Sequence, residues 1–189
     1  MTIIIANKRS KPDNLRKKHG DDSEIIDVTS KANQPWVHFS PFWPHGNIPV
    51  PFSDGVVATC VEGVWQALKV FESEGVDETK LHVTKMKGIK RTVRRLGAVK
   101  GHRKGMNGDE LLPYREAREL IYLPTFKWML DNCVQDELEQ LRSLTETKTV
   151  VLLDYTTNGD IDNLKTPLSH AALVKRHVED KWPVTARGD

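Results

Sequence analysis

The feature that most limits how this chain folds is a nearly unbroken apolar run close to its end, TVVLLDY at residues 149–155. A β-strand that is covered on both faces has this composition, because neither face meets water. Two shorter runs, at residues 2–6 and 24–28, are also rich in Ile and Val, which favours strands. Together the three runs predict a small β-sheet.

Helix signals fill most of the remaining chain. Three helices are predicted to begin where a capping residue precedes an apolar pattern, at Asp77, Asp109 and Thr166. Residues 134–147 predict a further amphipathic helix, because leucines recur on one side, and Pro124 is expected to kink or split the helix around it. A chain of 189 residues has the size of one domain. We therefore expect an α+β fold, mostly helical, in a single domain over residues 1–189.

Composition excludes several classes of protein. No apolar run approaches the length of a membrane-spanning helix, so no membrane association is expected. The two cysteines, Cys60 and Cys133, form no CxxC pair, which argues against a disulfide framework and a thiolate zinc site. The histidines form no metal-ligand pattern, and no Walker or GxGxxG loop occurs, so neither a metal nor a cofactor is expected. The N-terminal apolar patch precedes a basic cluster, the reverse of a secretory signal, which favours a soluble, cytoplasmic protein.

The distribution of charge is strongly asymmetric although the net charge is only +2. Residues 80–104 contain ten Lys or Arg and no acid, so the rest of the chain holds 18 bases against 26 acids, a net of −8. Residues 8–18 add six bases against Asp13 alone. Such segregation attracts phosphate-bearing ligands, nucleic acid among them. The alternative is that both clusters are solvated helix faces.

The most informative helix is predicted over residues 60–72, CVEGVWQALKVFE. Its apolar residues follow a helical spacing and form one stripe. Glu62, Gln66 and Lys69 fall within about 60° of one another on the neighbouring stripe, beside Trp65. A carboxylate, an amide and an ammonium are thus aligned next to an aromatic ring. The alternative is an ordinary solvated face with a Glu–Lys pairing.

An aromatic loop precedes this helix. Residues 35–53 contain five prolines and two histidines together with aromatic side chains that can stack on a base or ribose: Trp36, Phe39, Phe42 and Trp43. His45 lies in the same segment, where it binds substrate or braces the loop. We expect this segment to be ordered rather than a linker, because its aromatic residues anchor it to a core.

These residues carry a resemblance to a known family. The stretch FSPFWPHGNIPVPFSDGVVATCVEGVWQALKVF resembles the NADAR/YbiA-like superfamily of N-glycosidases, which has an S-x-F-Y-P-like loop followed by a helix of the form S/T-V-E-x-x-Y-Q-A-x-K-F. The matching residues are Ser40, Phe42, Trp43, Pro44, Val61, Glu62, Trp65, Gln66, Ala67 and Lys69, with Phe71 displaced by one. Gly63 stands where the family often has a histidine, and TNGDIDN, with Asp160, stands in place of its terminal W-G-x-G loop. The match covers roughly residues 38–72 and is looser beyond them.

The resemblance implies a NADAR-like fold and cleavage of the bond between ribose C1″ and the nitrogen of a base or amine, including removal of ADP-ribose from a nucleobase. An oxocarbenium-like transition state needs a carboxylate and a proton donor, which makes Glu62 the candidate general acid or base. Lys69 either holds a phosphate or forms an imine with the opened ribose. The candidate substrate-binding residues are Phe42, Trp43, His45, Trp65, Gln66, Arg91, Arg94, Arg95, Arg115 and Asp160.

Several of these assignments have simpler alternatives. Arg115 is equally suited to a surface pair with Glu119, and Asp160 to a turn. Asp154 at a strand end, and the adjacent Ser169 and His170, suit turn, capping and packing roles. For the whole protein, the rival function is a non-catalytic nucleotide- or nucleic-acid-binding module that uses residues 80–104. An inhibitor or assembly factor is also compatible with the sequence.

Overall fold

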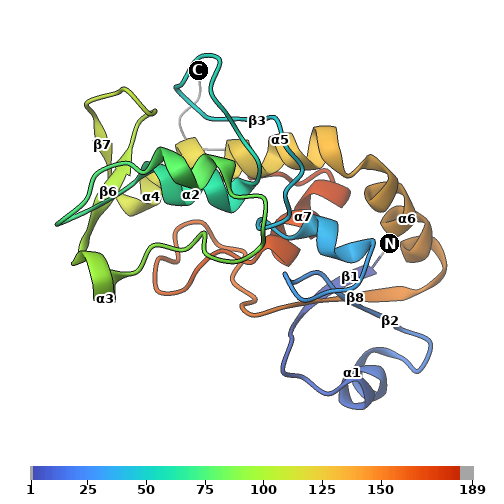
Figure 1. Ribbon diagram of the computed structural model, residues 1–189. Helices are drawn as coiled ribbons and strands as arrows, with labels where there is room; N and C mark the ends of the chain where they lie inside the picture. Colours follow the sequence, from blue (N-terminus) through green and yellow to red (C-terminus); the bar gives the residue numbers. More distant parts are fainter. Residues whose placement is uncertain (1, 184–189) are drawn as a thin grey trace. The chain divides into compact units, whose positions relative to one another are not determined.

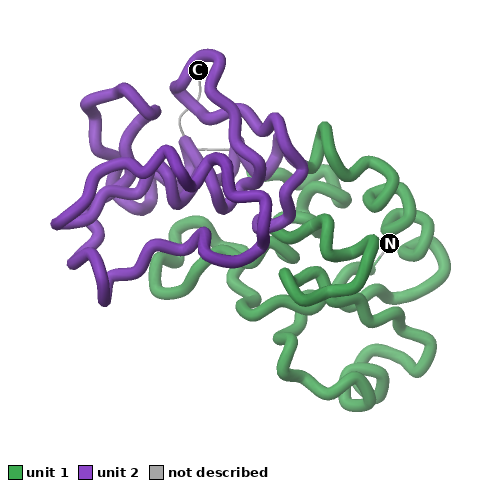
Figure 2. Tube along the Cα trace, viewed as in Figure 1, with its two compact units in different colours: residues 1–40, 130–189 green, residues 41–129 purple. Residues whose placement is uncertain are grey.

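The computed structural model describes residues 2–183, which form two compact units (Figure 2). Unit 1 combines both ends of the chain, up to Ser40 and from Leu130 onward, and unit 2 comprises Pro41–Met129. Each unit contains both helices and strands, so the predicted α+β class is confirmed. Within residues 2–183, no helix has the length and apolar character needed to cross a membrane.

Unit 1 is built on a parallel sheet of β1 (Thr2–Asn7), β8 (Thr149–Asp154) and β2 (Glu24–Asp27), in the order β1-β8-β2. The three predicted strands are therefore confirmed. The apolar run near the end of the chain lies in the centre of the sheet, where Val150 and Leu152 have no exposed surface. Their burial explains why this strand shows no alternation of apolar and polar residues.

Helices cover both faces of this sheet (Figure 1). Leu15 of one helix packs with Ala6, Val151 and Leu153, and two helices from the second half of the chain contact β8. The helical elements of unit 1 are α1 (Pro12–His19), η1 (Trp36–Phe39), α6 (Gln135–Thr147) and α7 (His170–Val178). The helix predicted at residues 134–147 is thus confirmed. The helix predicted to begin near Thr166 begins at His170, after Ser169 as its N-cap.

Unit 2 contains a short hairpin, a three-stranded antiparallel sheet and several helical segments. The strands are β3 (Ile48–Pro49), β4 (Val57–Ala58), β5 (Lys69–Phe71), β6 (Val99–Arg103) and β7 (Leu111–Leu112), with the sheet order β5-β6-β7. The helical segments are α2 (Val61–Leu68), η2 (Glu78–His82), α3 (Val93–Leu96), α4 (Tyr114–Ala117), η3 (Arg118–Tyr122) and α5 (Leu123–Cys133), whose last turn belongs to unit 1.

Two predicted helix boundaries in unit 2 are wrong. The helix expected over residues 60–72 ends at Leu68, and the chain continues as β5, which pairs with β6. The pairing brings backbone hydrogen bonds from a distant segment, such as the one from Glu72 to Ala98, that compete with a further helical turn. The helix expected from Asp109 begins only at Tyr114, because the intervening Leu111–Leu112 forms β7. The predicted start at Asp77 is confirmed, since its side chain caps η2.

The long helix of residues 114–133 is irregular in the turn that precedes Pro124. Proline has no N–H to donate to the preceding turn, and the turn immediately before it, η3, is a π-helix. The helix widens there and continues into α5 without a break in helical structure. Thr125 Oγ1 donates a hydrogen bond to the carbonyl of Ile121 at 2.6 Å, which satisfies a carbonyl within the irregular turn.

Candidate active site

Helix α2 is held at its start by close backbone packing. Cys60 is its N-cap, and Sγ accepts a hydrogen bond from the Gly63 N–H at 3.2 Å. Burial raises the pKa of the Cys60 thiol to about 11, so the thiol stays neutral near pH 7. A Cβ at Gly63 would lie 2.8 Å from the carbonyl oxygen of Lys80. There is no room at this position for the histidine of the NADAR-like pattern.

Glu62 is a buried carboxylate, only 8% exposed. Its backbone N–H donates to the Pro41 carbonyl at 2.8 Å, and its Oε1 accepts from Gln66 Nε2 at 2.9 Å. Burial raises the pKa of Glu62, while Gln66 and the cations of Lys69 and Lys90 partly oppose this effect. The alternative in which this stripe of α2 is a solvated face is wrong, because Gln66 is buried as well.

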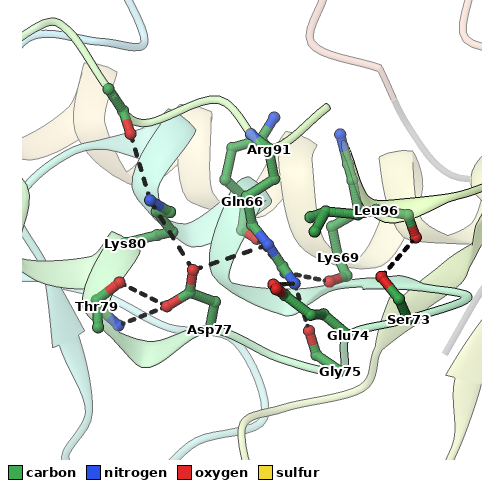
Figure 3. Close-up of polar contacts among 11 residues, drawn as sticks. Gln66, Lys69, Ser73, Glu74, Gly75, Asp77, Thr79, Lys80, Arg91 and Leu96 are labelled. Atoms are coloured by element: carbon green, nitrogen blue, oxygen red, sulfur yellow. Dashed lines mark hydrogen bonds and ion pairs between the residues drawn. The ribbon is translucent and has the colours of Figure 1, made fainter. Parts of the chain in front are cut away.

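Arg91 forms hydrogen bonds that hold the backbone at the end of α2 (Figure 3). Its backbone N–H donates to Gln66 Oε1 at 2.9 Å. Its guanidinium donates to the carbonyls of Gln66 at 3.2 Å, Lys69 at 2.5 Å and Gly75 at 2.7 Å. The side chain is 1% exposed. The prediction that Arg91 binds substrate as part of a basic surface is therefore wrong, because the guanidinium is buried and its two terminal nitrogens donate to groups inside the protein.

Lys69 is the first residue of β5 rather than a helix residue, and its side chain extends away from the Arg91 network (Figure 3). Its Nζ lies 5.8 Å from the centroid of the Trp65 ring. Burial lowers the pKa of Lys69, the charge of Glu62 raises it, and the charges of Lys90 and Arg91 lower it. A lysine with a lowered pKa has a larger fraction of nucleophilic amine near neutral pH.

His102 is a site residue that sequence reasoning missed. The sheet register makes it the cross-strand neighbour of Lys69, and its ring stacks on Trp65 with centroids 3.7 Å apart. Burial and the charge of Lys69 lower the pKa of His102 to about 3, so the imidazole is neutral. Nothing in the basic stretch around it marks it as special, because its placement depends on pairing between β5 and β6.

A cavity of about 340 Å³ opens beside these residues in unit 2. Its lining residues come from β5, β6 and the start of α4: Lys69, Val99, Lys100, Gly101, His102 and Tyr114. The lining includes two ammonium groups and no carboxylate. The Tyr114 ring lies 6.0 Å from that of Trp65, and Tyr122 meets Trp65 edge-on at 5.6 Å. Trp65 and Glu62 are not among the lining residues, but Trp65 contacts two of them, His102 and Tyr114.

The aromatic loop is ordered, as predicted, but its residues are divided between the two units. Phe42, Trp43 and His45 are half-buried in unit 2, where Lys90 Nζ lies 5.3 Å from the Phe42 ring centroid. Trp36 and Phe39 belong to unit 1 and stack with centroids 6.1 Å apart. The predicted stacking role is wrong for Phe39, which is fully buried. For Trp36, Phe42 and Trp43 it stays a prediction.

The rest of the basic segment 80–104 is divided between paired and exposed side chains. Lys104 pairs with Glu110 at 2.7 Å, and Arg103 donates to the Gly108 carbonyl at 2.8 Å. The exposed bases are Lys85, Lys87, Lys90, Arg94, Arg95 and Lys100. Outside this segment, Arg115 forms the predicted ion pair with Glu119, although the Glu119 side chain is buried and the pair is not a surface pair.

The polar candidates of unit 1 have structural roles. Ser169 donates to Asp154 Oδ2 at 2.8 Å and caps α7 by accepting from the Ala172 N–H at 3.2 Å. His170 places Nδ1 3.0 Å from the same carboxylate oxygen and Nε2 2.7 Å from the Val28 carbonyl. The predicted capping and packing roles are confirmed. Asp160 is exposed in a turn, where its Oδ1 accepts from the Asp162 N–H at 2.9 Å. No group of three potential metal ligands occurs within residues 2–183.

The fold and the site define an α+β protein with a buried carboxylate, a perturbed lysine and an aromatic cavity. The chain belongs to the family described as "Family of unknown function (DUF6939)", whose sequence pattern matches residues 7–174. That match spans parts of both units. Comparisons with curated proteins and with solved structures find no match.

Proposed function

We propose that this protein is a cytoplasmic, NADAR-like N-glycosidase that cleaves the bond between ribose C1″ and the nitrogen of a base or amine, with an ADP-ribosyl or ribosyl group as substrate. The observation that carries the proposal is the pairing of two groups with opposite perturbations. Glu62 has a raised pKa and Lys69 a lowered one, and each acts on the other through its charge. Groups perturbed in this way are typical of active sites.

The chemistry assigns one role to each group. Glu62, as a general acid, protonates the nitrogen of the leaving base when the C1″–N bond breaks. The amine of Lys69 attacks C1″ and forms an adduct that can open to an imine, and water then hydrolyses this adduct, which releases the sugar and restores the lysine. In the other form of the mechanism, Lys69 holds a phosphate as an ammonium and water attacks C1″ directly. Gln66 orients the Glu62 carboxyl through their 2.9 Å hydrogen bond.

The test is direct incubation of the full chain with ADP-ribosylated DNA, ADP-ribose and ribosylaminopyrimidines, followed by mass spectrometry of the released products. The proposal predicts release of a free base or amine together with the sugar. Borohydride added during turnover should give a stable adduct on Lys69 if the imine forms. If no substrate is cleaved and nucleic acid is bound, the protein is a binding module instead.

That rival function is supported by a separate observation, the row of exposed bases in segment 80–104. It predicts that affinity for single- and double-stranded nucleic acid falls steeply with salt. Replacing Arg94 and Arg95 together by Ala should weaken this binding, because both side chains are exposed. Arg91 is left unchanged in this test, since its guanidinium holds the backbone of unit 2.

A further inference from the structure

The side-chain amide of Gln66 has only one orientation that satisfies its neighbours. The Arg91 backbone N–H lies 2.9 Å from one end of this amide (Figure 3), and an N–H can only donate, so the atom that faces it is the acceptor Oε1. The other end, Nε2, then faces Glu62 and donates to its Oε1 at 2.9 Å. A flipped amide would place two donors against each other at Arg91 and two acceptors against each other at Glu62. Gln66 is only 3% exposed, so such mismatches would stay unsatisfied.

The two carboxyl oxygens of Glu62 have different surroundings. Oε1 accepts from Gln66, whereas Oε2 makes no hydrogen bond within residues 2–183. Oε2 is also not one of the fully enclosed side-chain oxygens and nitrogens that lack a partner in this part of the chain, so part of its surface is open. Glu62 thus has one oxygen that is held by the protein and one that a ligand can reach.

This difference determines where the carboxyl proton resides. In a carboxylic acid the carbonyl oxygen is a better hydrogen-bond acceptor than the hydroxyl oxygen. Because Gln66 Nε2 donates to Oε1, the neutral form of Glu62 keeps Oε1 as its carbonyl oxygen and carries its proton on Oε2. Burial raises the pKa of Glu62, so this neutral form persists to higher pH than in an ordinary glutamate.

We propose that Gln66 is a positioning residue, oriented by the Arg91 backbone N–H, that keeps the proton of Glu62 on Oε2 and makes Oε2 the atom that protonates the leaving nitrogen. The Oε2 proton moves to the nitrogen, which takes the electron pair of the C1″–N bond, and Glu62 is left as a carboxylate that Gln66 stabilises. The identity of the proton acceptor rests on the proposed function. The place of the proton does not, and it can be tested without a substrate.

The first experiment is NMR of the full chain labelled with ¹³C and ¹⁵N. The side-chain carboxyl carbon of Glu62 and the side-chain amide of Gln66 are followed as the pH is changed. We expect the Gln66 Nε2 signals to shift with the same midpoint as the Glu62 carboxyl, because Nε2 donates to that group. The Arg91 amide proton should exchange slowly with solvent, since it is donated to the buried Gln66 side chain.

Three variants separate positioning from packing. Gln66→Met fills a similar space without a donor, so the Glu62 titration should move to higher pH, because the Gln66 hydrogen bond lowers the pKa of Glu62. The high-pH limb of turnover, where Glu62 loses its proton, should move with it, and the maximal rate should fall by about 10-fold or more, since Oε2 no longer holds the proton in place. Gln66→Glu places a second carboxyl against Oε1, so the two groups should titrate as a coupled pair and turnover should also fall. Gln140→Glu makes the same change at an exposed position of α6 and should leave both the Glu62 titration and turnover unchanged.

A merely structural role of Gln66 predicts a lower Tm of Gln66→Met with an unchanged Glu62 titration, and that result would overturn the proposal. A wild-type Gln66 amide that does not follow the Glu62 titration would overturn it too, and this measurement needs no variant to fold. If the Glu62 titration moves as expected but the wild type cleaves no substrate, the placement of the proton is supported and the proposed function is refuted. If the wild type turns over and Gln66→Met matches its rate and pH profile, the proposed function stands and the positioning role is refuted.

Discussion

Replacement of Arg91 by Met should strongly destabilise the protein. The methionine keeps most of the apolar stem that packs on the Phe71 ring, whose centroid lies 4.9 Å from the guanidinium carbon. The substitution removes the donors to three carbonyls, those of Gln66, Lys69 and Gly75. Each buried acceptor left unsatisfied costs about 1–3 kcal/mol. Because water will reach some of them, we expect a loss of about 3–5 kcal/mol, the usual effect of breaking a buried charged network.

The assay is urea and thermal unfolding followed by circular dichroism. For a chain of this size, the expected loss corresponds to a decrease in Tm of roughly 10 °C. The matched control is Arg94→Met, three residues further along and exposed, which should change the free energy of unfolding by less than about 0.5 kcal/mol. An Arg91→Met protein within about 1 kcal/mol of wild type would refute the reasoning.

Three further predictions follow from the structure. Lys90→Met should raise the pKa of Lys69, because the Lys90 charge lowers it, and the pH dependence of borohydride trapping at Lys69 should move to higher pH; no movement would contradict the assignment. Asp154 has a lowered pKa and His170 a raised pKa, so the pair should stabilise the fold most between the ordinary pKa of an aspartate and the ordinary pKa of a histidine. The Asp154 contribution is lost as pH falls from the ordinary to the lowered pKa of this carboxyl, and the His170 contribution is lost as pH rises from the ordinary to the raised pKa of this imidazole. The stability difference between wild type and His170→Gln should therefore shrink above neutral pH, and a constant difference would be inconsistent with a charged His170. Phe71→Ala should cost about 3–5 kcal/mol in urea unfolding, since Phe71 is 2% exposed; a neutral effect would show that this ring is not part of the core.

The strands of unit 1 could be predicted from the sequence because a buried strand consists almost entirely of apolar residues, which the sequence shows directly. Val150, Val151 and Leu152 have no exposed surface, and a run of this kind has few alternatives. The end of α2 could not be predicted in the same way. The helical spacing of apolar residues continues past Leu68. The helix nevertheless ends there, because the following residues form β5 and pair with a strand about thirty residues away. Local periodicity carries no information about such a partner.

The candidate site was predictable in part. Glu62 and Gln66 lie one helical turn apart, so their proximity follows from helix geometry and is observed. Arg91 was grouped with surface bases because a charge run says nothing about which member is buried. His102 was missed because only the β5–β6 register places it next to Lys69. Residues brought together by long-range pairing are those that one sequence reveals least.

The central claim, that Glu62 acts as a general acid in an N-glycosidase, is tested most directly by the turnover of Glu62→Gln. The substitution preserves the shape of the side chain, so the fold and ligand binding should be retained. We expect the rate of base release from an ADP-ribosylated or ribosylated substrate to fall by at least ~100-fold, the lower scale for a lost general acid or base, while the unfolding curve stays near that of wild type. Turnover by Glu62→Gln at the wild-type rate would contradict the claim.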